Sequence, residues 1–174
     1  MHNLEFNQEN WDLILDRMQY LKTEVKKYKY DHLTGLRMRK DFDGYLTTLF
    51  EMYEFEDRMF TLILVDVMDL HNTNRLYGYT AGDELIKKVV QQLQQAFKEC
   101  NGTEVFRVGG DEFTVLIKGH NQEKLEGVLS SLTNVTYAYT VCDPNSDEEF
   151  ASPSHIFKIT DQKLVQKKVE VKRI

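Results

Sequence analysis

Two short apolar segments, 104–108 and 113–117, flank a Gly-Gly-Asp-Glu tetrapeptide at 109–112. Apolar segments of this length on either side of a Gly-containing turn predict a β-hairpin. The run at 60–65 is nearly continuously apolar, as a buried strand would be, and another strand is expected around 135–141. A chain with these strands must be built around a sheet that other segments cover.

Helical periodicity accounts for most of those covering segments. Apolar residues recur every three or four positions within 42–53 and 85–97, and helices are also expected at 122–132 and 154–169. Strands interleaved with helices, plus one hairpin, predict an α/β (α+β) fold, with a central mixed β-sheet flanked by helices.

The N-terminal segment, residues 7–30, is predicted to form one amphipathic helix before a turn at 31–36. We therefore expect two parts, an N-terminal helix at 1–30 for signalling or dimerisation and a globular domain at 31–174. The helix has two interpretations: it packs on its own domain, or it pairs two copies of the chain. Its apolar stripe has the a/d spacing of a heptad and consists of Trp11, Ile14, Met18, Leu21, Val25 and Tyr28.

The composition of the chain limits the classes of molecule that it is expected to bind. The 174 residues carry a formal net charge of −6, whereas a general nucleic-acid binder would present a basic face. No run approaches the roughly 18 apolar residues of a membrane span, and the N-terminus has no apolar leader, so we expect a cytoplasmic chain without membrane insertion. Cys100 and Cys142 are too far apart in sequence for a Cys-x-x-Cys zinc site. Small molecules or other proteins are the expected partners.

Three carboxylates are the strongest candidates for chemistry. Asp66 follows the strand at 60–65, and Asp111 and Glu112 lie at the predicted hairpin tip behind two glycines. Adjacent strands would bring Asp66 and the tip together, and the glycines would supply positive φ and room for a ligand. Such carboxylates suit Mg²⁺, which takes phosphate oxygens as further ligands. The tetrapeptide alone is equally consistent with an ordinary turn.

Other polar positions also allow a purely structural interpretation. Thr80 and Asp83 have the spacing of a capping box, which would open the helix at 85–97. Asn74 could be a loop residue, and the basic residues of the last helix could form a solvated face.

Several spaced motifs together resemble the GGDEF family of diguanylate cyclases, over about residues 31–173. The signature itself is spelled by Gly109-Gly110-Asp111-Glu112-Phe113. The other matches are, in chain order, Asp31-His32-Leu33-Thr34-Gly35-Leu36 with Arg39, then Asp66-Val67, Asn74, Gly78, Gly82-Asp83, and finally Asp161, Leu164 and Lys168.

The resemblance implies a palm-like nucleotide-cyclase fold that condenses two GTP into cyclic di-GMP and releases pyrophosphate. Each subunit of a homodimer would hold one GTP, with two Mg²⁺ (or Mn²⁺) per active site. The N-terminal helix would connect the domain to a sensor domain or a partner.

The resemblance also implies roles for individual residues. Asp66, Asp111 and the carbonyl of Val67 would bind the metal, with Asp111 and Glu112 as the catalytic carboxylates. The implied substrate-binding positions are Asn74 and Asp83 for guanine, Lys168 and Lys172 for the triphosphate, and Gly109, Gly110, Leu70 and His71 around the nucleotide. A carboxylate accepts from guanine N1–H and N2–H together, which adenine cannot offer, so ATP would leave acceptors unpaired.

The sequence departs from the family pattern at several positions. Met68 replaces a second Asp, Leu70-His71 replaces a Phe-Lys pair that reaches the phosphates, and the family's Gly-Arg-Asn segment near the end is not recognisable. Cys100 and Thr103 replace the product-inhibition motif, which predicts no feedback inhibition there. Three functions therefore remain: an active cyclase, a degenerate module that binds GTP or a partner and regulates without turnover, and a structural interaction domain.

Overall fold

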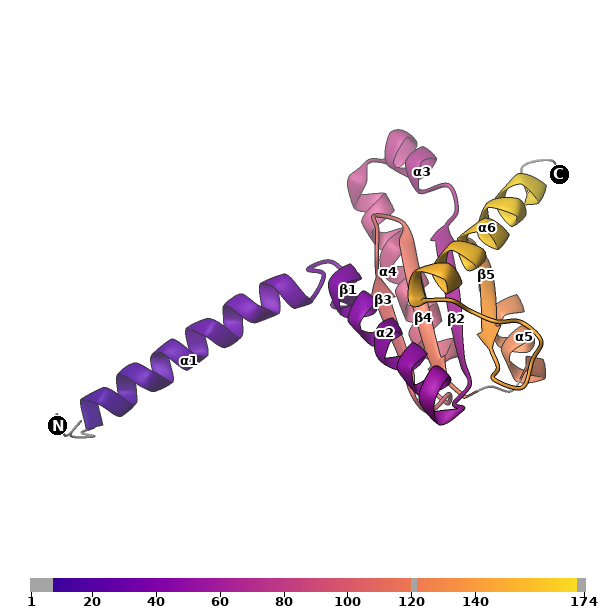
Figure 1. Ribbon diagram of the computed structural model, residues 1–174. Helices are drawn as coiled ribbons and strands as arrows, with labels where there is room; N and C mark the ends of the chain where they lie inside the picture. Colours follow the sequence, from indigo (N-terminus) through magenta and orange to yellow (C-terminus); the bar gives the residue numbers. More distant parts are fainter. Residues whose placement is uncertain (1–7, 120–121, 172–174) are drawn as a thin grey trace.

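The computed structural model describes residues 8–119 and 122–171. This part of the chain forms six helices and five strands, in the order α1-β1-α2-β2-α3-α4-β3-β4-α5-β5-α6 (Figure 1). The helices are α1 (Gln8–Lys29), α2 (Arg39–Glu56), α3 (Leu70–Tyr77), α4 (Tyr79–Ala96), α5 (Gln122–Ser130) and α6 (Pro153–Val171). The strands are β1 (Arg37–Met38), β2 (Phe60–Val67), β3 (Thr103–Arg107), β4 (Glu112–Lys118) and β5 (Val135–Cys142).

The strands form one mixed sheet in the order β1-β3-β4-β2-β5. β2 pairs antiparallel with both β4 and β5, β3 and β4 form the predicted hairpin, and β1 lies parallel to β3. The register places Asp66 directly opposite Glu112. The predicted mixed sheet and hairpin are thus confirmed, and β2 continues to Val67, two residues beyond the predicted strand.

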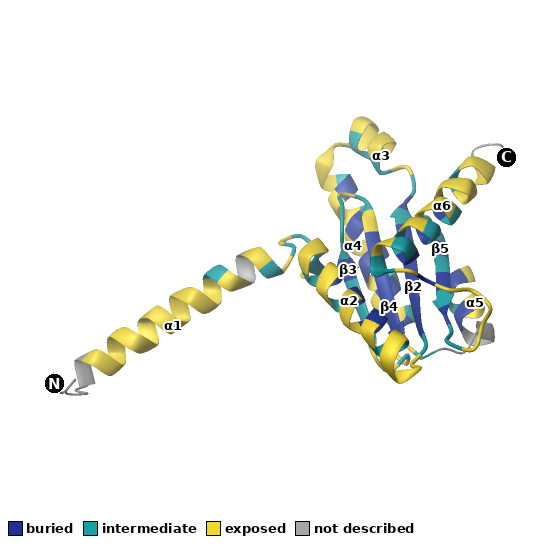
Figure 2. Ribbon diagram, in the orientation of Figure 1, coloured by how far each residue is buried: buried dark blue, intermediate teal, exposed yellow. Residues whose placement is uncertain are grey.

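Alternate residues of β2 face two separate cores, because successive side chains of a strand point to opposite faces. Ile63 and Val65 pack with α4 and α5, whereas Leu62 and Leu64 pack with α2 and α6. Figure 2 shows the result as buried strands between exposed helix surfaces. Asp66 continues the second series, so its side chain is directed toward the face that α6 covers.

Two elements were not predicted. β1 is only two residues long. α3 contains no fully buried residue and spans only eight residues, five of them polar, which is too short a segment to show a helical period in the sequence. The predicted capping box is also wrong: α4 already begins at Tyr79 after Gly78, and no side chain caps it.

α1 projects away from the sheet and its helices (Figure 1). The helix predicted at 7–30 is confirmed at Gln8–Lys29. Its apolar side chains are exposed, Trp11 by 50% and Val25 by 58%, so the interpretation that this helix packs on its own domain is wrong. None of the described helices combines the length and apolarity that a membrane span requires.

Candidate functional site

A cavity of about 510 Å³ opens where β2, the hairpin loop, α3 and the end of α6 meet. This volume is within the usual range for small-ligand pockets. Six predicted site residues line it: Asp66, Val67, Leu70, His71, Asp111 and Lys168. The remaining lining residues are Met68, Asp69, Asn72, Thr136 and Val171. Residues separated by more than 100 positions in sequence are thus brought to one place.

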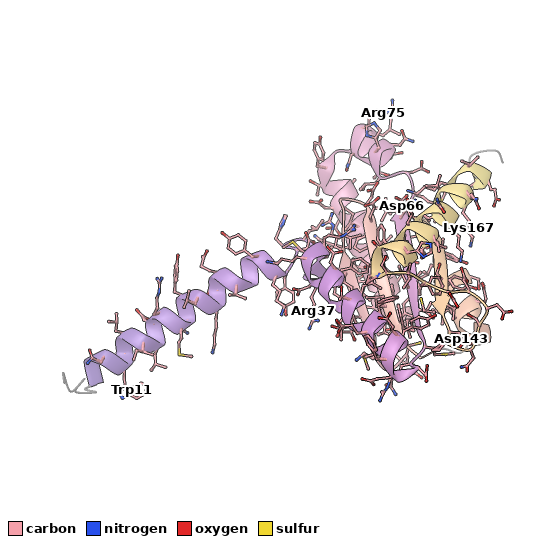
Figure 3. The ribbon with its side chains drawn as sticks, in the orientation of Figure 1. Trp11, Arg37, Asp66, Arg75, Asp143 and Lys167 are labelled. Atoms are coloured by element: carbon pink, nitrogen blue, oxygen red, sulfur yellow. The ribbon has the colours of Figure 1, made fainter. Side chains whose placement is uncertain are left out.

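Asp66 and Lys168 form an ion pair in the wall of this cavity. The Lys168 Nζ atom lies 2.6 Å from Asp66 Oδ2. The Asp66 side chain is only 15% exposed and that of Lys168 35% exposed, so water screens the pair less than it would a fully exposed one. Figure 3 labels Asp66 close to the helix that carries this lysine.

The hairpin loop is fixed to the end of β2 by its backbone. Val67 N–H donates to the Asp111 carbonyl at 2.9 Å, and the amides of Val108 and Gly109 donate to the Glu112 carbonyl. Asp111 is therefore held beside Asp66 by main-chain bonds, whatever its side chain binds.

The two signature glycines do not have the predicted positive φ, because the described glycines with positive φ are Gly35, Gly78, Gly102 and Gly119. Gly109 is required for space instead. A Cβ atom at this position would lie 2.6 Å from Glu112 Oε2 and 3.1 Å from Glu112 Cβ. A Cβ atom on Gly110 would meet nothing within 4 Å.

Arg107, which the sequence did not single out for a role, braces the same loop. Its Nη2 donates to the Gly110 carbonyl at 2.6 Å, and its Nη1 donates to Asp31 Oδ1 at 2.8 Å. Thr34 donates to that carboxylate oxygen through both its backbone N–H and its hydroxyl. Burial raises the pKa of Asp31, but the hydrogen bonds from Thr34 and Arg107 outweigh it and leave this pKa below its ordinary value. The motif at 31–36 marked Asp31 in the sequence, but nothing in it indicated that Arg107 would be its partner.

Asn74 lies in a fork between α3 and α4, outside the set of residues that line the cavity. Its Oδ1 atom is buried and has no hydrogen-bond partner among the described residues. Gly82 is packed so closely that a Cβ atom there would overlap Asn74 Oδ1 and lie 3.1 Å from Leu70 Cδ1. Leu70 thereby connects the fork to the cavity.

The remaining predicted site residues do not line the cavity or lie outside the described residues. Asp83 is exposed on α4, and Glu112 is exposed at the start of β4. Neither they nor Gly109 and Gly110 line the cavity. Lys172 lies outside the described residues.

The donors at the cavity suit a hard cation, although no group of three or more His, Cys, Asp and Glu residues within 8–119 and 122–171 is arranged as a metal centre. Asp66 and Asp111 offer carboxylate oxygens, the ligand type that Mg²⁺ prefers when phosphates and water complete its coordination. Asp69, which the sequence reasoning missed, adds a third carboxylate to the wall, from a left-handed backbone with φ of 57°. It could have been recognised from the sequence, because it directly follows Met68, which stands where the family usually has an Asp.

The family model described as "Diguanylate cyclase, GGDEF domain" matches residues 28–150. The chain belongs to the GGDEF domain family of diguanylate cyclases. This confirms the resemblance predicted from the spaced motifs.

Solved structures with the same fold include two informative GGDEF proteins. The coiled coil and GGDEF domain of DgcB from Caulobacter crescentus, in complex with c-di-GMP, has a TM-score of 0.78 at 18% identity and covers 93% of this chain and 92% of that one. The diguanylate cyclase SiaD from Pseudomonas aeruginosa, in complex with its activator SiaC, has a TM-score of 0.68 at 20% identity and covers 93% of this chain and 68% of that one. The palm-like GGDEF fold is therefore confirmed, including an N-terminal helix.

Among curated proteins, the chain is similar to an uncharacterized membrane protein of Staphylococcus aureus strain USA300. The two are 33% identical over 96 residues, which is 55% of this chain and 26% of that protein. The similarity thus spans about a quarter of the relative's length.

Proposed function

We propose that the chain is an active diguanylate cyclase, which condenses two GTP into cyclic di-GMP and releases pyrophosphate. The main support is that Asp66, Asp111 and Lys168 line one cavity, next to an intact signature hairpin. Carboxylates that hold a metal and a cation that binds phosphate are two features that recur in phosphoryl-transfer sites.

In this proposal Asp66, Asp111 and the Val67 carbonyl hold two Mg²⁺ ions, or Mn²⁺ in their place. Bound metal would neutralise charge on the triphosphate and lower the pKa of the attacking 3′-hydroxyl. Glu112 stands opposite Asp66 in the sheet register and would accept a hydrogen bond from that hydroxyl. The main-chain bonds of the hairpin loop would keep these carboxylates in place while the nucleotide enters.

Recognition of guanine is proposed for Asn74 and Asp83. The unpartnered Oδ1 of Asn74 supports this role, because a buried acceptor without a donor costs about 1–3 kcal/mol that a ligand N–H can recover. Asp83 is exposed near the start of α4, where its carboxylate would accept from guanine N1–H and N2–H.

The triphosphate would lie along the cavity. Lys168 and Lys172 would supply positive charge to it, and Leu70 and His71 would form its wall. Gly109 and Gly110, on the hairpin loop beside the cavity, would contact the nucleotide through their backbone.

Dimerisation is proposed as part of catalysis, since one GTP per subunit cannot form a cyclic dinucleotide without a second. The exposed apolar stripe of α1 supports a parallel pairing of two chains, consistent with the coiled coil that accompanies the GGDEF domain in DgcB. Such pairing would raise the local concentration of one half-site at the other. By this proposal residues 1–30 form the dimerisation or signalling helix, through which a sensor domain or partner acts, and residues 31–174 form the cyclase domain.

A second candidate function is a degenerate module that binds GTP or a partner without turnover. His71 and Leu70 favour it, because they line the cavity at the positions where the Phe-Lys pair of the family would reach the phosphates. Loss of that cation would weaken phosphate binding.

The decisive experiment incubates the purified chain with GTP and Mg²⁺ at high protein concentration and identifies nucleotides by mass. We expect cyclic di-GMP, at a rate per subunit that rises with protein concentration. Asp111→Ala should abolish the product without unfolding the domain, while Asp147→Ala, an exposed carboxylate remote from the cavity, serves as the matched control. Binding of GTP without product by a dimer would select the regulatory module, and no nucleotide binding would select a structural role.

A further inference from the structure

Lys168 is distinguished from Lys163 and Lys167, two other lysines of α6, by its partner. Lys163 Nζ donates to Thr140 Oγ1 at 3.2 Å, and Lys167 Nζ lies 4.6 Å from the centre of the Tyr137 ring. Lys168 Nζ alone among these three reaches a carboxylate, Asp66, at 2.6 Å. Three lysines on one helix thus have three different partners, and only one enters the cavity.

This ammonium group contacts the carboxylate of Asp66, which a metal at this site would also use. Both a metal ion and Lys168 would be bound by the carboxylate of Asp66, and Lys168 and Asp66 line the same cavity. Two cations at one carboxylate repel each other strongly where the side chains are partly shielded from water. The contact of Lys168 with Oδ2 therefore competes with a metal for the carboxylate of Asp66.

We infer that Lys168 is a displaceable counter-ion of the metal site, an inference that rests on the proposed function. In the metal-free chain Lys168 neutralises Asp66. When the metal enters, the lysine leaves Asp66 and turns to the phosphates of the nucleotide. A lysine can make this exchange by rotation of its own flexible stem, so α6 need not move.

This exchange has a consequence that a merely structural lysine would not have. Removal of the ammonium group eliminates a competitor for Asp66 and so should tighten binding of metal alone. The same change removes a phosphate contact and so should weaken binding of nucleotide. The substitution should therefore change the affinity for metal and the affinity for nucleotide in opposite directions, because one ammonium group competes with the metal and contacts the phosphates.

The first test titrates the nucleotide-free chain with Mn²⁺ and measures free Mn²⁺ by electron paramagnetic resonance. Lys168→Gln should bind Mn²⁺ about fivefold more tightly than the original chain. Lys167→Gln, which removes the same charge from the next residue, should change the affinity little, and Lys168→Arg should not tighten it. Unchanged or weaker Mn²⁺ binding by Lys168→Gln would overturn the inference.

The nucleotide arm uses a GTP analogue with a methylene group between the α- and β-phosphorus atoms, so that no reaction occurs. Lys168→Gln should weaken its binding in the presence of Mn²⁺, by about tenfold for a lost charged contact. Equal or tighter binding of the analogue would also refute the exchange.

A measurement on the unaltered chain avoids any effect of the substitution on folding. Acetylation of lysines by N-acetoxysuccinimide, followed residue by residue with mass spectrometry, should be faster at Lys168 when Mn²⁺ saturates the site, and unchanged at Lys167. No acceleration at Lys168 would refute displacement. If cyclic di-GMP is nevertheless formed, only this inference fails, whereas undiminished Mn²⁺ binding by Asp66→Asn would refute the metal assignment of the proposed function as well.

Discussion

The Asp31–Arg107 pair gives the prediction whose magnitude follows most directly from the structure. Asp31 Oδ1 accepts three hydrogen bonds, from Arg107 at 2.8 Å and from the Thr34 amide and hydroxyl at 2.9 and 2.6 Å. The two charged side chains are only 13% and 12% exposed. Asp31→Ala would leave the guanidinium partly buried without its counter-charge, which costs about 3 kcal/mol.

The assay is urea unfolding followed by circular dichroism, with thermal melting as a second measure. A loss of about 3 kcal/mol corresponds to a fall in Tm of about 6–12 °C for a chain of this size. Asp43→Ala is the matched control, since Asp43 pairs with Arg39 at 3.0 Å but both side chains are about half exposed, and it should cost less than about 1 kcal/mol. A fall of less than about 2 °C for Asp31→Ala, or additive effects in a double-mutant cycle with Arg107→Ala, would refute the reasoning.

The same pair predicts a dependence of stability on pH. Because the folded pKa of Asp31 lies below its unfolded value near 3.8, the unfolded chain binds more protons in this range. The contribution of Asp31 is therefore complete above the unfolded pKa and is lost as the pH falls through the folded pKa. The difference in unfolding free energy between the unaltered chain and Asp31→Asn should shrink on acidification, and a difference that stays constant down to about pH 2 would contradict the assignment.

Two glycines provide further predictions. Gly109→Ala should lower the free energy of unfolding by about 1 kcal/mol more than Gly110→Ala, because only the former places a Cβ atom against Glu112, and equal values in urea unfolding would argue against this. Gly82→Ala should displace the Asn74 amide but change Tm little, since alanine favours the helix by up to about 1 kcal/mol. Its affinity for GTP, measured by calorimetry, should fall about tenfold, and an unchanged affinity would remove Asn74 from guanine recognition.

Much of the fold could be predicted because its strands are apolar enough to be recognised locally. The runs that became β2 and β4 are buried on both faces, so they appear in the sequence as continuous apolar segments. α3 was missed for a different reason, since its eight residues, five of them polar, are too few for a helical period to be recognised. The start of α4 was misplaced because Gly78, rather than a polar side chain, precedes it.

The candidate site could be predicted only where neighbouring strands determine it. The approach of Asp66 to the hairpin follows from antiparallel pairing of β2 and β4, which the sequence pattern implied. The contact of Asp66 with Lys168 spans 102 positions, and that of Asp31 with Arg107 spans 76. These contacts depend on how α6 and the N-terminal turn pack on the sheet. Local sequence patterns do not predict that packing.

The place where α1 joins the domain has a mechanical consequence. One residue, Tyr30, separates the end of α1 at Lys29 from Asp31, and it is tied to Arg37 by a β-bridge. A helix of 22 residues is a stiff rod about 33 Å long. A small force at its far end therefore acts with a long lever arm about Tyr30, next to Asp31, whose carboxylate is connected through Arg107 to the hairpin loop at Gly110.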